Sequence, residues 1–572
     1  MSPIDKKQGR ALVLDAESSA GLEVVQSLGK RGVLLDATSS QDDCLAFYSR
    51  YVHRKLRQPG YDSSKGEFSN WIHDLHHSSQ YDLIVPATEA SLLMMRTLDA
   101  GDEVRLRAAM PCNSALDVAL DKERTWELAT ELGIPVPKSV VYSSLDDLGE
   151  EPAYPVVLKP VKSKVEIAGQ LQHFWPSIVC NREERTSILE SWLPHIRVQQ
   201  QSFIRGTGIG IELLFNKAEK VWHFAHERLH EYPLSGGRST YRKSILPDPR
   251  MLAAAEALLR ALEWHGVAMV EFKLGENGDF YLLEINPRLW GSLALAIDAG
   301  VDFPFGLLLL VSRQDLPPQP QYRVPYYTRD FALDVAWLRR NQRADHRSPL
   351  LLTRSSPRSL LEYLRVLLGR ESWDHFDFRD LRITYLILRS VCLDFFRIAL
   401  QTVHKRLLEV RLQYSHRRLL RKNTQPKNLL FICYGNICRS PIAEYLARTM
   451  LPGVQVTSAG ISEMEGRRCP QKIVRIGAKM GFDLSRFRSR QVSQSQIDQA
   501  DLILAMDLEN YAEITKRHPN ARQRTTALGL FAIDPSPSIP DPYDSSEEEA
   551  EEVSKKIQSG IIGLSKWLES GS

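Results

Sequence analysis

The stretch Phe431–Pro441, FICYGNICRSP, decides how the last part of this chain folds. It follows the apolar run of 428–432, typical of a buried strand, and precedes a pattern typical of a helix. Pro441 suits the first turn of that helix, where its missing N–H costs nothing. The order strand, short polar loop, helix opens a fresh βα pattern, so we predict a separate α/β domain over 426–572.

The polar loop between strand and helix has the composition of an anion cradle. A loop of this length directs backbone N–H groups inward, and the helix dipole adds to their effect. These groups and Arg439 favour the thiolate of Cys433, while Arg439 can hold two phosphate oxygens at once. Ser440 can hydrogen-bond the thiolate, and Asn436 tolerates the left-handed backbone of a tight loop. Cys433 is therefore predicted to be a nucleophile; the alternative is a buried structural cysteine beside a chance arginine.

A leaving group also needs an acid. Asp541 lies between prolines in IPDPYDSS, on a loop that can fold over the cradle, although it could be a turn residue only. With CYGNICRSP, SAG (458–460), AMD (505–507) and DPY (541–543), the whole of 426–572 resembles the low-molecular-weight protein tyrosine phosphatases. The resemblance implies a doubly wound parallel sheet, with Cys433 as nucleophile, Arg439 on the phosphate, and Asp541 as acid and then base for hydrolysis of a cysteinyl phosphate.

The resemblance also assigns roles to neighbouring residues. Tyr543 would stack on an aromatic substrate, and Cys438 would form a reversible disulfide with Cys433, or else only pack. Relatives that act on phosphoarginine carry threonine at the position of Ile437, so this chain is expected to act on phosphotyrosine or another aryl phosphate. Arsenate reductases need further cysteines downstream, and none follows Cys469.

A second pattern lies in GVAMVEFKLGENGDFYLLEINPR (266–288). Asn277–Gly278 predicts a two-residue hairpin turn, in which residues whose numbers sum to 555 face each other. Glu271 then opposes Glu284, and one apolar face is predicted to hold Val270, Phe272, Leu274, Tyr281, Leu283 and Ile285. Opposed carboxylates destabilise a sheet unless a cation joins them. With Asn286 they form an oxygen set suited to Mg²⁺, although a wet sheet edge would also tolerate the pair.

The segment from about 110 to 310 resembles the carboxylate–amine ligase branch of the ATP-grasp family, on DKERTWELATELGIPVP, YPVVLKP, the glycine turn RGTGIG and EF…LLEINPR. The βαβ rhythm of the first hundred residues resembles the Rossmann-like subdomain that precedes it. The resemblance implies ATP and Mg²⁺ as cofactors and carboxylate and amine small molecules as substrates. The residues it implies are Lys122 and Lys159 for ATP phosphates, Gln201, Ser202, Phe203 and Ile204 for the nucleotide hinge, Glu271, Glu284 and Asn286 for the metal, and Arg288 for a substrate carboxylate or acyl phosphate.

Two segments depart from the family pattern or leave alternatives open. The hinge strand QQQSFI lacks the acidic residue that is common before the glycine turn, which leaves amides and a hydroxyl for the ribose. The segment 226–244 carries Arg228, His230, Arg238 and Arg242 around a Gly–Gly turn. These side chains could hold an anionic substrate or belong to a solvated loop.

Composition sets the remaining expectations. A chain of 572 residues is too long for a single hydrophobic core, so several domains are expected. A net charge of +3 gives no argument that the protein binds nucleic acid. Seven scattered cysteines indicate a reduced, cytoplasmic protein. The segment 383–403 is long enough to cross a bilayer, but three charges in its middle favour an amphipathic helix packed on a domain. The basic continuation leaves peripheral contact through helix 383–422, with a partner or an anionic membrane surface, as the alternative.

We therefore predict an α/β multi-domain chain: a Rossmann-like domain at 1–112, an ATP-grasp domain at 113–315, a linker and helical extension at 316–425, and the phosphatase at 426–572. The leading hypothesis is a bifunctional enzyme with both sites active. One alternative is a phosphatase regulated by a nucleotide-binding module that does not ligate. The other is a biosynthetic enzyme whose phosphatase acts on a small phosphorylated intermediate.

Overall fold

The computed structural model describes residues 9–60, 65–161, 164–167, 170–344, 350–421, 425–543, 545 and 547–570. The chain divides into two compact units, Met1–Val391 and Cys392–Ser572. The boundary falls inside the 40-residue helix α13 (Leu381–Leu420), which therefore contributes residues to both units. Among the described residues, no single helix has the length and apolar composition to cross a membrane; the bent pair α9 (Leu293–Ala299) and α10 (Phe303–Val311) meets that test only when taken together.

The first sheet of the N-terminal unit is parallel, with strand order β3–β2–β1–β4. Its central strand β1 is a short apolar run that is buried from Ala11 to Leu14, as expected for a parallel sheet covered by helices. The βαβ rhythm expected from the sequence is present. Its elements are β1 (Arg10–Leu14), α1 (Ser19–Lys30), β2 (Leu34–Ser39), η1 (Leu45–Tyr48), β3 (Val52–Arg57), α2 (Lys65–Ser79), β4 (Leu83–Pro86), α3 (Glu89–Met95), α4 (Glu103–Leu106) and α5 (Asn113–Ala119).

An antiparallel sheet of order β5–β10–β6–β9 follows. Helix α6 begins at Lys122 because the Asp121 carboxylate caps it, accepting hydrogen bonds from two backbone N–H groups of the first turn. Strand β6 sets Lys159 opposite Gln199 of β10. The elements are α6 (Lys122–Glu131), β5 (Ser139–Tyr142), η2 (Leu145–Asp147), β6 (Val156–Pro160), β7 (Lys164–Ile167), β8 (Gln170–His173), β9 (Ser177–Val179), α7 (Arg182–Trp192) and β10 (Val198–Ser202).

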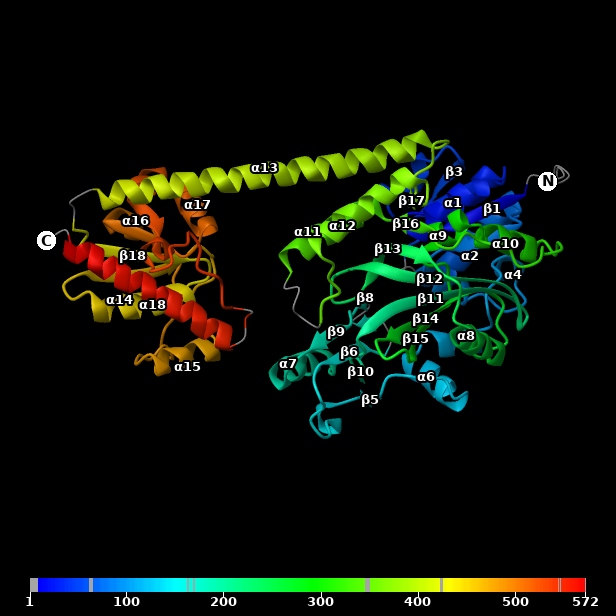
Figure 1. The fold of residues 1–572 in the computed structure, drawn as a ribbon, viewed down its shortest axis with the longest axis horizontal. Coiled ribbons are helices and arrows are strands. Elements are labelled where there is room, and N and C mark those ends of the chain that lie inside the picture. The colour runs from blue at the N-terminus through cyan, green and yellow to red at the C-terminus, as the bar shows by residue number, and fades with distance from the viewer. Residues whose placement is uncertain are drawn as a thin grey trace. The chain divides into compact units, whose positions relative to one another are not determined.

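A seven-stranded sheet of order β15–β14–β11–β12–β13–β16–β17 completes this unit (Figure 1). Strands β16 and β17 come from the segment that the sequence analysis assigns to a linker and helices. Each has three residues, too few for an alternating pattern to show. The elements are β11 (Gly206–Asn216), β12 (Glu219–Tyr232), β13 (Arg238–Ser244), α8 (Pro249–Ala261), β14 (Gly266–Gly275), β15 (Phe280–Asn286), β16 (Tyr327–Arg329), α11 (Phe331–Arg343), α12 (Ser356–Glu362), η3 (Tyr363–Leu368) and β17 (Glu371–Trp373).

The β14–β15 hairpin pairs Glu271 with Glu284 as predicted, but by a different route. The two-residue turn is wrong: the Gly275 N–H donates to the Asp279 carbonyl, and only Gly278 has a positive φ, of 83°. The first pairs therefore sum to 554, and a bulge after Glu271 restores the sum of 555. Because of this shift the core face of β15 holds Phe280 and Leu282, and not Tyr281 and Leu283 as the sequence analysis expects.

The C-terminal unit is built on a parallel sheet of order β19–β18–β20–β21. The chain leaves β18 for β19 on one side and continues to β20 on the other, so the strand order reverses at β18. Crevices at the carboxyl end of such a strand hold ligands in open parallel sheets. The elements are β18 (Asn428–Cys433), α14 (Arg439–Met450), β19 (Gln455–Gly460), α15 (Gln471–Lys479), α16 (Gln494–Gln499), β20 (Leu502–Ala505), α17 (Leu508–Arg517), η4 (Pro519–Arg524), β21 (Thr525–Ala527), η5 (Leu528–Phe531) and α18 (Glu547–Ser570).

Helix α13 packs at both ends, each within its own unit. Ile383 is fully buried in the core of the first unit. Leu412 contacts the cluster around Tyr511, and Leu419 joins the main core of the second unit. The helix expected over 383–403 is present, but among the described residues it packs on a domain only at its start, around Ile383; Leu393, Phe396, Leu400 and Val403 are exposed, which corrects the prediction for this half of the segment. Lys422, the last residue of the predicted basic helix, lies outside the described residues.

Candidate active sites

Cys433 is the last residue of β18, and residues 434–438 join it to α14. Its Sγ lies 3.0 Å from Oγ of Ser440 and accepts a hydrogen bond from the backbone N–H of Asn436 at 3.2 Å. The residue is 2% exposed. Once the sulfur is a thiolate, the Ser440 hydroxyl can donate to it as well, so two donors face one buried sulfur.

Arg439, the first residue of α14, holds the two carboxylates of the site. Its Nη1 lies 2.6 Å from Oδ2 of Asp507, and its Nη2 lies 2.8 Å from Oδ2 of Asp541. Burial by itself lowers the pKa of Arg439, but Cys433 and the two carboxylates outweigh it and raise the pKa. The structure thus brings together the predicted nucleophile and phosphate-binding arginine, which share one motif, and the acid, which lies about a hundred residues later in the sequence.

Asn436 fixes the shape of the loop. It is fully buried and has the left-handed backbone that the sequence analysis expects, with φ of 50°. Its Nδ2 donates to Oγ of Ser440 at 2.9 Å and to Oγ of Ser458 at 2.8 Å, and its Oδ1 accepts from the N–H of Arg490 at 2.9 Å. Its backbone N–H is the donor to Cys433, so these three side-chain bonds orient a group that touches the nucleophile.

The other predicted residues of this site differ in exposure. Ile437 and Cys438 are buried in the core of the unit, and burial raises the pKa of the Cys438 thiol. Tyr543 is 54% exposed, as a residue that stacks on an incoming ring must be. Their assignments to specificity, redox protection and stacking stay predictions.

The paired glutamates of the first unit lie among several cations. Nδ2 of Asn286 donates to Oε1 of Glu271 at 3.1 Å and to Oε1 of Glu284 at 3.2 Å. Nη2 of Arg228 lies 2.6 Å from Oε2 of Glu271. Burial raises the pKa of Glu271 against the effect of Arg228, and Glu284 adds to the rise. The carboxylates, the carboxamide and the arginine therefore form one continuous polar cluster.

The predicted ATP lysines act on the same cluster. Burial favours the neutral acid at Glu284, but Lys122 and Lys159 outweigh it and lower its pKa. Burial in turn lowers the pKa of Lys159 to about 8, although Glu284 opposes the shift. The three residues come from α6, β6 and β15, which the fold brings to one place.

The glycine turn RGTGIG does not form. Gly206, Gly208 and Gly210 lie within β11, where Gly208 and Gly210 leave room for side chains of β12 and Gly206 lies against the backbone of Leu274 in β14. A Cβ on Gly208 would lie 3.0 Å from Cδ of Arg228, and one on Gly210 would lie 2.3 Å from the ring of His226. The glycines let Arg228 lie across β11 toward Glu271, which corrects their predicted role as a turn.

The predicted nucleotide hinge, residues 201–204, begins in β10. Gln201 is 5% exposed, and its Oε1 has no hydrogen-bond partner among the described residues. The Ser202 N–H donates to the carbonyl of Lys138, and Phe203 and Ile204 are half-buried. An unpartnered buried acceptor is a group that a ligand donor can satisfy.

The segment 226–244 is not a solvated loop. It forms β12 and β13, and two of its side chains are buried against carboxylates. His230 is fully buried between Asp334 (2.8 Å) and Glu362 (3.0 Å), and Arg242 pairs with Asp374. Neither is available to a substrate, whereas Arg238 is half-exposed beside Asp330.

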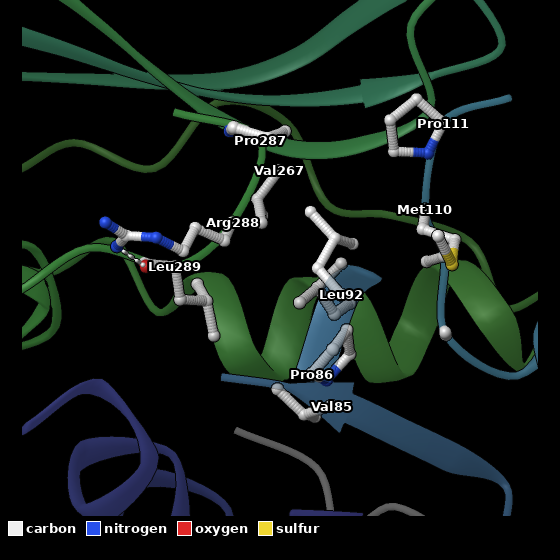
Figure 2. A pocket seen from close by; sticks show the side chains of 12 residues that line it. Val85, Pro86, Leu92, Met110, Pro111, Val267, Pro287, Arg288 and Leu289 are labelled. Atoms are coloured by element: carbon white, nitrogen blue, oxygen red, sulfur yellow. Dashed lines mark hydrogen bonds between the residues drawn. The ribbon is translucent and has the colours of Figure 1, made fainter. Parts of the chain in front are cut away.

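Arg288 lies at the edge of a small, mostly apolar pocket. Figure 2 shows Val85, Pro86, Leu92, Met110, Pro111, Val267 and Pro287 around it, contributed by β4, α3, the segment before α5 and the ends of the hairpin. Nη1 of Arg288 donates to the carbonyl of Leu289 at 2.9 Å. The side chain is thus placed at the junction of the first sheet and the hairpin.

Sequence reasoning missed the roles of three residues. Asp507 holds Arg439, Ser458 binds Asn436, and Glu444 pairs with Arg490 at 3.0 Å. The motif SAG contains Ser458 and the motif AMD contains Asp507, but a motif does not show which residue each side chain contacts. Arg228 had no distinguishing signal, because its partner lies on a strand that follows much later in the chain.

The family named "Low molecular weight phosphotyrosine protein phosphatase" matches residues 428–571, and "ATP-grasp in the biosynthetic pathway with Ter operon" matches residues 210–331. The low molecular weight protein-tyrosine-phosphatase Ptp of Acinetobacter johnsonii is 36% identical over 25% of this chain and 99% of its own length. YwlE arginine phosphatase from Geobacillus stearothermophilus is 32% identical over 25% of this chain and 94% of that one, with a TM-score of 0.24. N5-carboxyaminoimidazole synthetase from Staphylococcus aureus is 16% identical over 58% of this chain and 84% of that one, with a TM-score of 0.46.

Proposed function

Since this chain belongs, through residues 428–571, to the low-molecular-weight phosphotyrosine protein phosphatases, we propose that it hydrolyses phosphotyrosine or a related aryl phosphate at Cys433 and ligates a carboxylate to an amine with ATP in its N-terminal unit. The geometry around Cys433 carries the first activity: a buried sulfur with two donors lies in one site with an arginine and an acid. The paired glutamates beside two lysines support the second.

In the phosphatase reaction, the sulfur of Cys433 attacks phosphorus and the bond to the aryl oxygen breaks. Asp541 gives its proton to that oxygen, and Arg439 neutralises the charge on the phosphoryl oxygens. Asp541 then takes a proton from water, which attacks phosphorus and breaks the bond to sulfur. Inorganic phosphate leaves and the thiolate is restored.

Hydrolysis of p-nitrophenyl phosphate tests the mechanism. Cys433→Ser is expected to abolish turnover, whereas Cys392→Ser, an exposed cysteine of the same unit, leaves it intact. Retained turnover in Cys433→Ser would refute the proposal. A phosphotyrosine peptide and phosphoarginine, compared as substrates, test the role of Ile437: the peptide is expected to react faster, and Ile437→Thr is expected to reduce that preference.

The donor set of the first unit fits Mg²⁺ on chemical grounds. Two carboxylates face each other across a hairpin with a carboxamide against both, and rotation of the Asn286 amide presents its oxygen in place of its nitrogen. Described residues contain no group of three or more His, Cys, Asp or Glu side chains placed for a metal, so substrate phosphates would complete the shell. A bound Mg²⁺ would neutralise phosphate charge. Glu271, Glu284 and Asn286 would hold it, Lys122 and Lys159 would bind the phosphates, and Arg288 would orient the carboxylate.

Release of ADP with panels of carboxylates and amines tests the ligase. Glu284→Gln is expected to abolish release, while Glu276→Gln, in the exposed loop of the same hairpin, does not. If no substrate pair stimulates ADP release while ATP changes the phosphatase rate, the ligase proposal fails and the first unit is a regulatory nucleotide-binding module instead.

All seven cysteines are free thiols, which supports our proposal of a cytoplasmic protein.

A further inference from the structure

Helix α13 carries a row of large apolar side chains that face solvent. Among the described residues of the second unit, seven of the nine exposed large apolar side chains of α13 lie at positions 393, 396, 400, 403, 407, 410 and 414, with exposed fractions between 44% and 68%, while Phe395 and Leu420 lie outside this row. They are Leu393, Phe396, Leu400, Val403, Leu407, Val410 and Tyr414, which we call the α13 seam. Monomeric proteins seldom leave so many contiguous apolar side chains in water unless the surface has a partner.

The spacing of the α13 seam identifies the kind of partner. Successive members are three, four, three, four, three and four residues apart, which is the a/d repeat of three heptads. A strict repeat of seven gives a narrow stripe that another helix covers by supercoiling, whereas helices that lie on membranes present a wider apolar face. The pattern therefore favours a helix as the occupant.

The rest of the helix surface agrees with this assignment. With Leu393 at an a position, the residues that pack on the phosphatase core are Leu408, Leu412, Ser415, His416 and Leu419. They occupy b, c and f positions, which face outward in a coiled coil. The phosphatase thus covers the outer face of α13 from Leu408 to Leu419 and leaves the a/d face open.

We propose that the α13 seam binds the α13 seam of a second copy of this chain, forming a two-helix coiled coil. At roughly 200 Å² for a fully exposed large side chain, seven residues at about half exposure would bury about 700 Å² per chain. Two chains then bury about 1,400 Å², within the range of about 1,200–2,000 Å² found in stable complexes. A second copy also offers an a/d row of the same length.

The flanks of the seam give the dimer a recognisable salt dependence. Arg397 and Arg411 occupy e positions and Arg406 a g position, so the two helices bring like charges together. Salt screens that repulsion. The affinity of one copy for the other is therefore expected to rise with the salt concentration, whereas the affinity for an anionic partner or membrane would fall.

Sedimentation velocity of the full-length chain tests the proposal, at concentrations from about 0.5 to 50 µM and at about 0.05 and 0.5 M salt. We expect a monomer–dimer equilibrium that shifts toward dimer at the higher salt. Leu400→Glu/Leu407→Glu, which places charges in the interface, is expected to raise the dissociation constant by at least ~100-fold. Turnover of p-nitrophenyl phosphate per chain should not change, which shows that the variant is folded.

Gln401→Glu/Lys405→Gln is the matched control, because it makes the same change in net charge at the exposed b and f positions 401 and 405. It is expected to stay dimeric. A wild-type chain that is monomeric throughout, or a dimer that survives Leu400→Glu/Leu407→Glu, would overturn the proposal. So would a monomer that sediments with phosphatidylserine vesicles at low salt and leaves them at high salt, because the membrane would then be the occupant.

Discussion

The side chain of Asn436 should contribute several kcal/mol to the stability of the phosphatase unit. Asn436→Ala removes three buried hydrogen bonds, each of which contributes about 1 kcal/mol. It also places alanine at a φ of 50°, where a left-handed backbone costs about 1–2 kcal/mol. The expected loss is about 4–5 kcal/mol. For a domain of this size that corresponds to a fall of about 8–20 °C in the midpoint of thermal inactivation.

Thermal inactivation of p-nitrophenyl phosphate turnover measures this loss without interference from the N-terminal unit. Asn436→Gly should recover the backbone part only, because glycine accepts positive φ but makes none of the three bonds. Asn520→Ala, at an exposed position of η4, is the control and should not shift the midpoint. A midpoint for Asn436→Ala within about 2 °C of the wild type would refute the reasoning, since it would mean that the three bonds contribute nothing measurable.

Three further changes have defined outcomes. Asp541→Asn should lower kcat by roughly 10²–10⁴-fold, and more for phenyl phosphate than for p-nitrophenyl phosphate because the poorer leaving group needs the proton more; equal losses would argue against an acid role. Lys159, whose pKa burial lowers to about 8, loses its charge as pH rises, so ATP affinity measured by calorimetry should fall up to about 10-fold from pH 7 to pH 9. Lys159→Arg should remove that dependence, and a persistent slope would exclude this residue. Burial lowers the pKa of His416 to about 4, below its unfolded value of about 6.5, so the unfolded state binds more protons between these values and stability falls as pH drops. His416→Gln should remove about 1 kcal/mol of the stability lost between pH 7 and pH 5, allowing for the partial exposure of the ring, as thermal inactivation at the two pH values would show.

The sequence was most informative where chemistry is local. Cys433, Asn436, Arg439 and Ser440 lie within one loop and the helix that follows it, so strand, turn and helix signals were enough to place them around one sulfur. Asp541 lies about a hundred residues away, and its place depended on the family resemblance. Its contact with Arg439 could not be derived from spacing.

Local rules failed where the partner of a residue lies far along the chain. The hairpin prediction reached the correct pairing of Glu271 with Glu284 although the turn was wrong, because a bulge offset the longer loop. The bulge is hidden in the sequence of β15, because Tyr281 and Leu283 are apolar as well as Phe280 and Leu282. A solvated loop is one of the two predictions for His230 and Arg242. The carboxylates that they contact belong to 330–375, a segment with little periodicity, so no pattern in the sequence indicates these contacts.

Strands β16 and β17 set where the N-terminal half can be divided. A chain ending at Asp315, the boundary predicted from the sequence, would lose Asp334 and Asp374. His230 and Arg242 would then be left as buried groups without their acids, and breaking a buried pair in this way costs about 3–5 kcal/mol. A fragment that keeps both partners must therefore extend past β17 to Asp374 at least. The residues from Tyr327 to Asp374 are part of the architecture of the N-terminal unit, and any recombination that kept this unit intact would have to keep them.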